Sequence, residues 1–501
     1  MTRIVIIGGG PAGYEAALVA TQLGADVTVV ERDGPGGACV LSDCVPSKTF
    51  IATSEAMTTF RDAGTLGIRT DRRTGPASGG DPHGARNADI DATNADIDDF
   101  DVDAPTVYGR VRRLARAQSD DIRRRLEREG VDVISGTAGF GATQSRRTHR
   151  IEITAAGSTS DAGIRAVDAG TRAVDADVVL VATGATPRIV AGAEPDGERV
   201  LTWRQVYDLP ALPEHLIVVG SGVTGAEFAS AYTEMGLQVT FVCSRDRVLP
   251  GEDSDAAALL EDVFTSRGMR ILKRGRASRV RRTGDGVVVD LADGRSVRGS
   301  HALMAVGSAP NTAELGLDGI GVAADTRGFL PVDRVSRTGV PGVYAAGDCT
   351  GVLMLASVAA MQGRIAMWHA LGEAVTPLKL TTVSANVFTH PEIATVGAQQ
   401  AAVEAGQVDA RAITLPLATN PRAKMQNVTA GMVKLFCRPS TGVVVGGVVV
   451  APSASELILP ITLAVEHNLS VSQLAHTFAV YPSMSGSITE AARQLMERTT
   501  D

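Results

Sequence analysis

Two segments of this 501-residue chain repeat one pattern, and this repeat restricts the possible folds more than any other feature. Each has an apolar stretch, a Gly-x-Gly-x-x-Gly turn, a helix-like stretch and a second apolar stretch, at 3–31 and 215–243. Such glycines permit a tight turn and let a pyrophosphate approach a helix N-terminus. Two complete units predict an α/β protein with two Rossmann-like dinucleotide-binding domains rather than ordinary α/β turns. The glycines are Gly8, Gly10 and Gly13 in the first unit, and Gly220, Gly222 and Gly225 in the second.

The residue 18 positions after the third glycine differs between the two units. In the first unit it is Glu31, at the end of a predicted strand, where a carboxylate can accept hydrogen bonds from an adenosine ribose. In the second unit it is Cys243, followed by Ser244, Arg245 and Arg247. No carboxylate stands there to repel a 2′-phosphate, and an arginine can pair with one. The second site is therefore expected to prefer NADPH and to accept NADH as well, since these arginines can equally be solvated.

Charge and composition narrow the possible partners. The formal net charge of −8 gives no overall attraction to nucleic acid or anionic lipid, so small molecules are the expected partners. The start, MTRIVIIGGG, lacks the pattern of a signal peptide, and the apolar stretch at 443–451 is too short to span a bilayer. We expect a cytoplasmic protein without an integral membrane segment. The five cysteines and eight histidines do not have metal-ligand spacing, so no metal is predicted.

Residues 71–104 differ in composition from the rest of the chain, with seven aspartates between 87 and 103. The spacing lacks the glycine and terminal glutamate of a calcium-binding loop, so a solvated, flexible acidic insertion is predicted. The eight arginines of the following stretch, 110–130, are interpreted as a solvated helical face.

The stretch GGACVLSDCVPSK at 36–48 contains a pair of cysteines with local signs of reactivity. Pro46 is a good first-turn residue, so Cys44 is expected at a helix N-terminus, where the helix dipole lowers the pKa of a thiol. Lys48, one turn later, would favour the thiolate further. These features predict that Cys39 and Cys44 form a reactive pair, while two inert buried cysteines are the alternative.

With both nucleotide units beside this cysteine pair, the chain resembles the flavoprotein disulfide reductases, such as dihydrolipoamide dehydrogenase and glutathione reductase, almost from end to end. Four more segments carry the resemblance: VLVATGATPR at 179–188, GVYAAGDC at 342–349, VFTHPEIATVG at 387–397 and SMSGSITEAA at 483–492. It implies an FAD-binding domain at 1–184, an NAD(P)-binding domain at 185–306, a return to the FAD domain at 307–378, and an α+β dimerisation domain at 379–501. It also implies a homodimer.

The resemblance also implies roles for individual residues. FAD would occupy the first site and NAD(P)H the second. Asp348 would hold the ribityl chain of the flavin, and Lys48 would pair with Glu227 beside the flavin ring. Cys44 would face the flavin, while Cys39 would exchange with a substrate. The other implied FAD contacts are Thr183, Gly184 and Gly347.

One part of the family pattern is missing. Disulfide-reducing members have a His-Pro dipeptide and a glutamate five residues after the histidine, whereas this chain has Tyr481 and Gly486 at those positions. An imidazole has an ordinary pKa near ~6.5 and exchanges protons at neutral pH, but a phenol near ~10 does not act as an ordinary base. Disulfide exchange needs that proton transfer, whereas electron transfer from a reduced flavin to a quinone does not need the exchange thiol.

We therefore interpret the chain as an FAD-dependent NAD(P)H dehydrogenase that reduces a quinone, closest to the NAD(P)H quinone reductase branch of that family. A disulfide oxidoreductase that uses Cys39 and Cys44 with a relocated acid/base group is the first alternative. A non-catalytic dimeric flavoprotein that serves as a binding module is the second.

Overall fold

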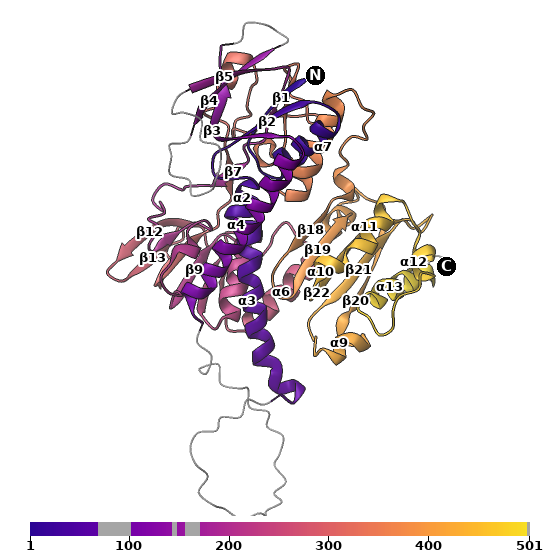
Figure 1. Cartoon of the computed structure of the whole chain (residues 1–501). Helices are drawn as coiled ribbons and strands as arrows, with labels where there is room; N and C mark the ends of the chain where they lie inside the picture. Colours follow the sequence, from indigo (N-terminus) through magenta and orange to yellow (C-terminus); the bar gives the residue numbers. More distant parts are fainter. Residues whose placement is uncertain (69–101, 143–147, 156–170, 498–501) are drawn as a thin grey trace, which may run out of the picture.

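The computed structural model describes residues 1–68, 102–142, 148–155 and 171–497 (Figure 1). The acidic insertion predicted at 71–104 therefore lies outside the described residues, except for its last three positions. The described chain forms three main sheets with helices packed around them. None of the described helices combines the length and the apolar character that crossing a membrane requires.

The first sheet contains the first glycine unit. Its strand order is β17-β6-β1-β2-β3-β4-β5, parallel from β17 to β3 and antiparallel from β3 to β5. Helix α1 (Pro11–Gln22) connects β1 to β2, and α7 (Ala356–Ala370) packs on α1. The strands are β1 (Arg3–Ile7), β2 (Asp26–Glu31), β3 (Asp132–Phe140), β4 (His149–Ala155), β5 (Thr171–Ala176), β6 (Val178–Val181) and β17 (Val343–Ala345).

The second sheet repeats this arrangement around the second glycine unit. All five strands are parallel in the order β11-β10-β9-β15-β8, and α5 (Val223–Glu234) connects β9 to β10. A small sheet of β12, β13 and β14 contacts β9 and β15 of this sheet, and β7 and β16 form a separate two-stranded sheet. The strands are β7 (Ala185–Pro187), β8 (Val200–Leu201), β9 (His215–Val219), β10 (Gln238–Val242), β11 (Arg270–Leu272), β12 (Ala277–Thr283), β13 (Gly286–Leu291), β14 (Ser296–Gly299), β15 (His301–Met304) and β16 (Ser308–Pro310).

The third sheet is antiparallel, in the order β18-β19-β22-β21-β20, and forms the C-terminal unit shown in orange and yellow in Figure 1. Its strands are β18 (Ser384–Val387), β19 (Glu392–Gly397), β20 (Arg411–Pro416), β21 (Met432–Cys437) and β22 (Val444–Ala451). The remaining helices include the long α3 (Cys44–Asp62) and α4 (Ala104–Arg128), with α2 (Gly37–Leu41), α6 (Ser254–Ser266), α8 (Gln400–Glu404), α9 (Pro421–Met425), α10 (Ala454–Leu457), α11 (Leu459–Glu466), α12 (Val471–Ala475) and α13 (Gly486–Glu497).

The glycine spacing has the same structural cause in both units. A Cβ atom added to Gly13 would lie 1.9 Å from the carbonyl oxygen of Gly8, and one added to Gly225 would lie 1.9 Å from that of Gly220. The helix therefore begins so close to the preceding strand that only glycine fits the contact. Gly8 and Gly220 also have φ angles of +106° and +114°, which glycine adopts most readily. Together with the parallel sheets, this geometry agrees with the predicted pair of Rossmann-like units.

Strand β21 shows how the C-terminal sheet is held against the second unit. Side chains alternate along a strand. Val433 and Leu435 accordingly join the core under the C-terminal helices, while Met432 and Phe436 pack against the second unit. Lys434 points to this second face, is 1% exposed, and places its Nζ 2.8 Å from both carboxylate oxygens of Asp253, the N-cap residue of α6.

This buried ion pair generates a prediction about stability. Lys434→Met keeps most of the side-chain volume but leaves the fully buried Asp253 carboxylate without its cation. Removal of one partner of a buried pair costs about 3–5 kcal/mol of unfolding free energy. Lys379→Met is a matched control, because the Lys379–Glu466 pair is 3.6 Å apart and both side chains are more than a third exposed. It should cost no more than about 1 kcal/mol. Equal losses in urea denaturation would contradict a structural role for the buried pair.

Candidate active site

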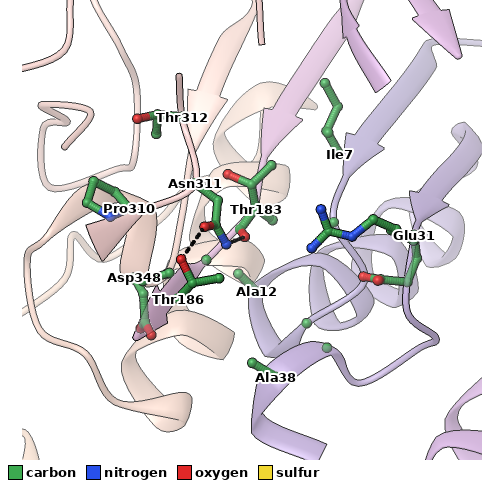
Figure 2. Close-up of a pocket in the computed structure, with 18 of the residues that line it drawn as sticks. Ile7, Ala12, Glu31, Ala38, Thr183, Thr186, Pro310, Asn311, Thr312 and Asp348 are labelled. Atoms are coloured by element: carbon green, nitrogen blue, oxygen red, sulfur yellow. Dashed lines mark hydrogen bonds between the residues drawn. The ribbon is translucent and has the colours of Figure 1, made fainter. Parts of the chain in front are cut away.

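A cavity of about 720 Å³ opens at the carboxyl ends of the first sheet's parallel strands. Figure 2 shows Glu31 and Asp348 on opposite sides of it, with Thr183 and Asn311 between them. Most of the residues predicted for the first site line this single cavity: Gly8, Gly10, Glu31, Cys39, Cys44, Thr183, Gly184, Gly347 and Asp348. The structure thus gathers residues that are more than 300 positions apart in the sequence.

The start of α1 leaves room for a ligand beside its backbone. A Cβ atom added to Gly10 would meet no atom within 4 Å, and the same holds for Gly222 in the second unit. Each of these glycines is the N-cap of its helix and has no side chain that could cover the free amides. Helix N-termini of this kind bind phosphate groups through their amides and dipole. The geometry therefore suits the pyrophosphate of a dinucleotide at both places.

Glu31 has a fixed orientation at one wall of the cavity. Its Oε2 accepts a hydrogen bond from the amide of Gly9 at 2.6 Å, and its Oε1 accepts one from the amide of Asp33 at 2.7 Å. Burial raises the pKa of this carboxyl group, although the two amides partly oppose the shift. The remaining lone pairs can accept hydrogen bonds from a ribose diol, as the sequence predicts.

Asp348 lies at the other wall, in the short helical turn after β17. Burial raises the pKa of its carboxyl group to about 6, and the neighbouring Asp43 adds to the shift. The preceding residue, Gly347, donates its amide to Oε1 of Gln362 at 2.9 Å. Gln362 on α7 thus fixes the loop that carries Asp348, a role for which the sequence gives no spacing signal.

Asn311 is a second supporting residue that sequence reasoning missed. Its Nδ2 donates to the carbonyl oxygen of Thr183 at 2.9 Å, and its Oδ1 accepts from Oγ1 of Thr186 at 3.1 Å (Figure 2). Its own amide donates to the carbonyl oxygen of Gly184 at 3.0 Å. Asn311 therefore connects the loop after β6, where the chain leaves the first unit, to the segment after β16, where it returns from the second unit.

Lys48 and Glu227 meet as the resemblance implied, although they are 179 positions apart. Lys48 Nζ lies 2.7 Å from Oε2 of Glu227, whose side chain is 5% exposed. Oε1 of Glu227 accepts a hydrogen bond from the Phe388 amide at 3.0 Å, and Lys48 Nζ lies 4.7 Å from the centre of the Phe388 ring. Burial alone would lower the pKa of Lys48, but its attraction to Glu227 raises it overall. The contact therefore joins α3, α5 and the segment after β18 through one fixed cation.

Cys39 and Cys44 lie together at the cavity, in α2 and in the first turn of α3. The predicted position of Cys44 at a helix N-terminus is confirmed. The predicted direction of its pKa shift is wrong, because the hydrogen bond between the two thiols, burial and Asp43 all raise the pKa of Cys44. The lowered pKa belongs to Cys39, mainly because of the hydrogen bond from Cys44.

The end of β10 places the predicted coenzyme-selecting residues on the surface of the second unit. Cys243 is fully buried, whereas Ser244 and Arg245 are exposed. Arg247 donates to the carbonyl oxygens of Pro250 and Glu252 and is thereby part of the loop structure. The Arg245 side chain makes no hydrogen bond within the part of the chain that the structure describes.

Tyr481 is not brought to this cavity within one chain. Its side chain is 83% exposed, and the nearby Phe478 and Val480 are exposed as well. All three lie in the segment between α12 and α13 of the C-terminal unit. Across the described ranges, no group of three or more histidine, cysteine, aspartate or glutamate side chains is arranged to hold a metal ion.

Comparisons with known proteins agree with this geometry. Residues 2–363 match the family of pyridine nucleotide-disulphide oxidoreductases, and residues 383–492 match the dimerisation domain of that family. The chain is 57% identical to a protein of Mycobacterium tuberculosis named NAD(P)H dehydrogenase (quinone), over 99% of this chain and 94% of that protein. It is 32% identical to dihydrolipoyl dehydrogenase 2 of Haloarcula marismortui, over 98% and 96% of the two chains.

Solved structures give the same result. The crystal structure of LpdA from Mycobacterium tuberculosis is 56% identical, has a TM-score of 0.88, and is matched over 99% of this chain and 100% of that chain. These matches confirm the predicted fold class and the resemblance to the flavoprotein disulfide reductases. The chain belongs to the pyridine nucleotide-disulphide oxidoreductases, flavin-dependent enzymes that use FAD and NAD(P)H.

Proposed function

We propose that this protein is an NAD(P)H dehydrogenase that delivers its electrons to a quinone-type acceptor. The observation that carries the proposal is the Lys48–Glu227 pair, which is formed at 2.7 Å, combined with Tyr481 and Gly486 at the positions of the family's acid/base dyad. The groups that serve the nucleotides are present, while the base that serves disulfide exchange is replaced. The name of the relative that is 57% identical supports the same acceptor class.

The cavity fits FAD, which would take a hydride from NAD(P)H and pass its electrons to the acceptor. We propose that Gly10 and the N-terminus of α1 hold the pyrophosphate, that Glu31 holds the adenosine ribose, and that Asp348 holds the ribityl chain. Lys48 would keep a positive charge beside the ring, because Glu227 holds its ammonium group in place. The proposed boundaries are 1–184 and 307–378 for the FAD domain, 185–306 for the NAD(P) domain and 379–501 for the dimerisation domain.

We also propose that the protein is a homodimer. The match to a dimerisation domain at 383–492 supports this assembly. Phe478, Val480 and Tyr481 are exposed aromatic and apolar side chains within the same segment, and their exposure is costly in a monomer. Burial against a second copy would remove this cost.

Two other functions remain as competing proposals. A disulfide oxidoreductase with a relocated acid/base group is favoured by the lowered pKa of Cys39 and by the position of both thiols at the cavity. A binding module without catalysis would not need the Lys48–Glu227 pair, and this argues against it. An acceptor screen on the purified holoenzyme, with naphthoquinones and benzoquinones against lipoamide and glutathione disulfide, distinguishes the three. Turnover only with disulfides would refute the proposed quinone function.

The dispensability of the two sulfurs is a direct prediction of this function. The double variant Cys39→Ala, Cys44→Ala should retain NADPH-driven quinone reduction within about tenfold, equivalent to ~1.4 kcal/mol in the barrier. Its residual disulfide reduction should disappear. Steady-state rates should be measured for each preparation and divided by its content of bound flavin. A thousandfold loss of quinone reduction with flavin still bound would place the sulfurs on the electron path.

Restoring the missing dyad offers a converse prediction. Tyr481→His with Gly486→Glu should raise disulfide reduction, because a positioned general base commonly contributes about 10²- to 10⁴-fold in rate. Quinone turnover should change little, because it does not depend on the exchange thiol. The single variant Gly486→Glu serves as a control, since it adds the acid without the imidazole. No gain over that control would argue that the two positions do not serve the thiols.

The preference for NADPH is predicted to depend on Arg245. Arg245→Ala should weaken NADPH binding more than NADH binding by roughly 1–3 kcal/mol, the usual value of a hydrogen bond to a charged group. Arg298→Ala, on the exposed side of β14, removes the same charge from the same unit and should not change the preference. Binding constants for both coenzymes should be measured by isothermal titration. Equal losses for NADPH and NADH would remove the reason for assigning this role to Arg245.

A further inference from the structure

Asp43 is an acidic residue beside the two thiols to which neither the sequence nor the family match assigns a role. It is the N-cap residue of α3, but its side chain accepts no hydrogen bond from the first turn of that helix. An aspartate at an N-cap ordinarily accepts one from the amide two or three residues later. The backbone is fixed instead. The Asp43 amide donates to the carbonyl oxygen of Ala38, and the Asp43 carbonyl oxygen accepts a hydrogen bond from the Ser47 amide, both at 2.8 Å.

The carboxylate of Asp43 therefore points elsewhere. It lines the same cavity as Cys39, Cys44 and Asp348, and it accepts no hydrogen bond from any residue that the structure describes. Burial raises the pKa of Asp43, while the charges of Lys48 and of Arg204, which also lines the cavity, favour its ionised form without a hydrogen bond to it. An acid of this kind, left without a partner at the wall of a cavity, acts on its neighbours through its charge.

We propose that the Asp43 carboxylate disfavours the reduced form of the Cys39–Cys44 pair, so that electrons from NAD(P)H leave with the soluble acceptor instead of remaining on the two sulfurs. This inference rests on the proposed quinone function. It makes Asp43 a positioning residue, because it acts through the two thiols and not on the acceptor itself.

The electron balance shows why a carboxylate has this effect. Reduction of the disulfide breaks the S–S bond and takes up two electrons from NAD(P)H. With one proton taken up, one sulfur is a thiol and the other a thiolate. With two protons, both are thiols. A fixed negative charge nearby makes the thiolate form less stable, and burial strengthens this repulsion.

The charged groups around the pair act in both directions. Asp43 raises the pKa of both thiols, and Asp348 raises that of Cys39. Lys48 lowers the pKa of both, but its ammonium group is also paired with the Glu227 carboxylate. Removal of the Asp43 charge should therefore lower the pKa of Cys39 further and stabilise the reduced pair most at alkaline pH, where the thiolate is populated.

Asp43→Asn in the full-length holoenzyme tests this inference. After reduction and removal of the reductant, the rate of Cys39 alkylation by iodoacetamide is measured from pH 6 to 10 by mass spectrometry. We expect the midpoint of the pH profile to fall by about one unit, equivalent to about tenfold more thiolate below the midpoint. A second measurement adds one equivalent of NADPH without oxygen and counts the thiols that can be alkylated, which should increase in the variant.

Three further variants complete the test. Asp43→Glu keeps the charge and should keep the parent profile. Asp285→Asn removes the same charge from an exposed turn between β12 and β13 and should have no effect. Asp43→Ser is a second neutral variant if the asparagine variant loses its flavin. An unchanged alkylation midpoint in the neutral variants would overturn the inference, whatever the acceptor. Failure of the parent to reduce quinones would instead refute the proposed function and leave the alkylation result to decide the effect of Asp43 on the thiols.

Discussion

The Lys48–Glu227 ion pair is the contact on which the geometry of the site depends. Glu227 is almost completely buried and uses both carboxylate oxygens, one for the ammonium group of Lys48 and one for the amide of Phe388. Loss of Lys48 would leave the buried Glu227 carboxylate without its cation, at a cost of about 3–5 kcal/mol. Loss of Glu227 would cost less, because the Lys48 side chain is 30% exposed. The pair thereby fixes the start of α3, which carries Cys44, relative to the second nucleotide unit and the C-terminal sheet.

The sequence predicts those parts of the site whose geometry is local. Gly8 and Gly13 are close in the chain, and their contact follows from the path of one strand, one turn and one helix. The position of Glu31 at the end of the second strand follows from the same local pattern. Lys48 and Glu227 are 179 positions apart, so only the resemblance to a family could pair them. Asn311 and Gln362 were missed because each supports a loop through a contact that leaves no periodic or spacing signal.

The wrong prediction for Cys44 shows the limit of reading one effect from a motif. A helix N-terminus contributes about half a unit charge, and its influence decreases within the first turn. At Cys44 this effect competes with a hydrogen bond to Cys39, with burial and with the full charge of Asp43. The last three effects were not visible as a set in the sequence, because they depend on how α2 packs against the start of α3.

The same balance of charges bears on the route of the electrons. Lys48 is a positive charge in the same helix as Cys44, and its ammonium group is paired with Glu227. Asp43 and Asp348 contribute two carboxyl groups to the wall around the sulfurs, which Arg204 also lines. A sulfur that gains electrons there must carry negative charge or take up a proton. A quinone that takes up two protons with its two electrons leaves as a neutral hydroquinone, whereas the Cys39–Cys44 pair keeps a negative charge at the wall whenever only one proton is taken up.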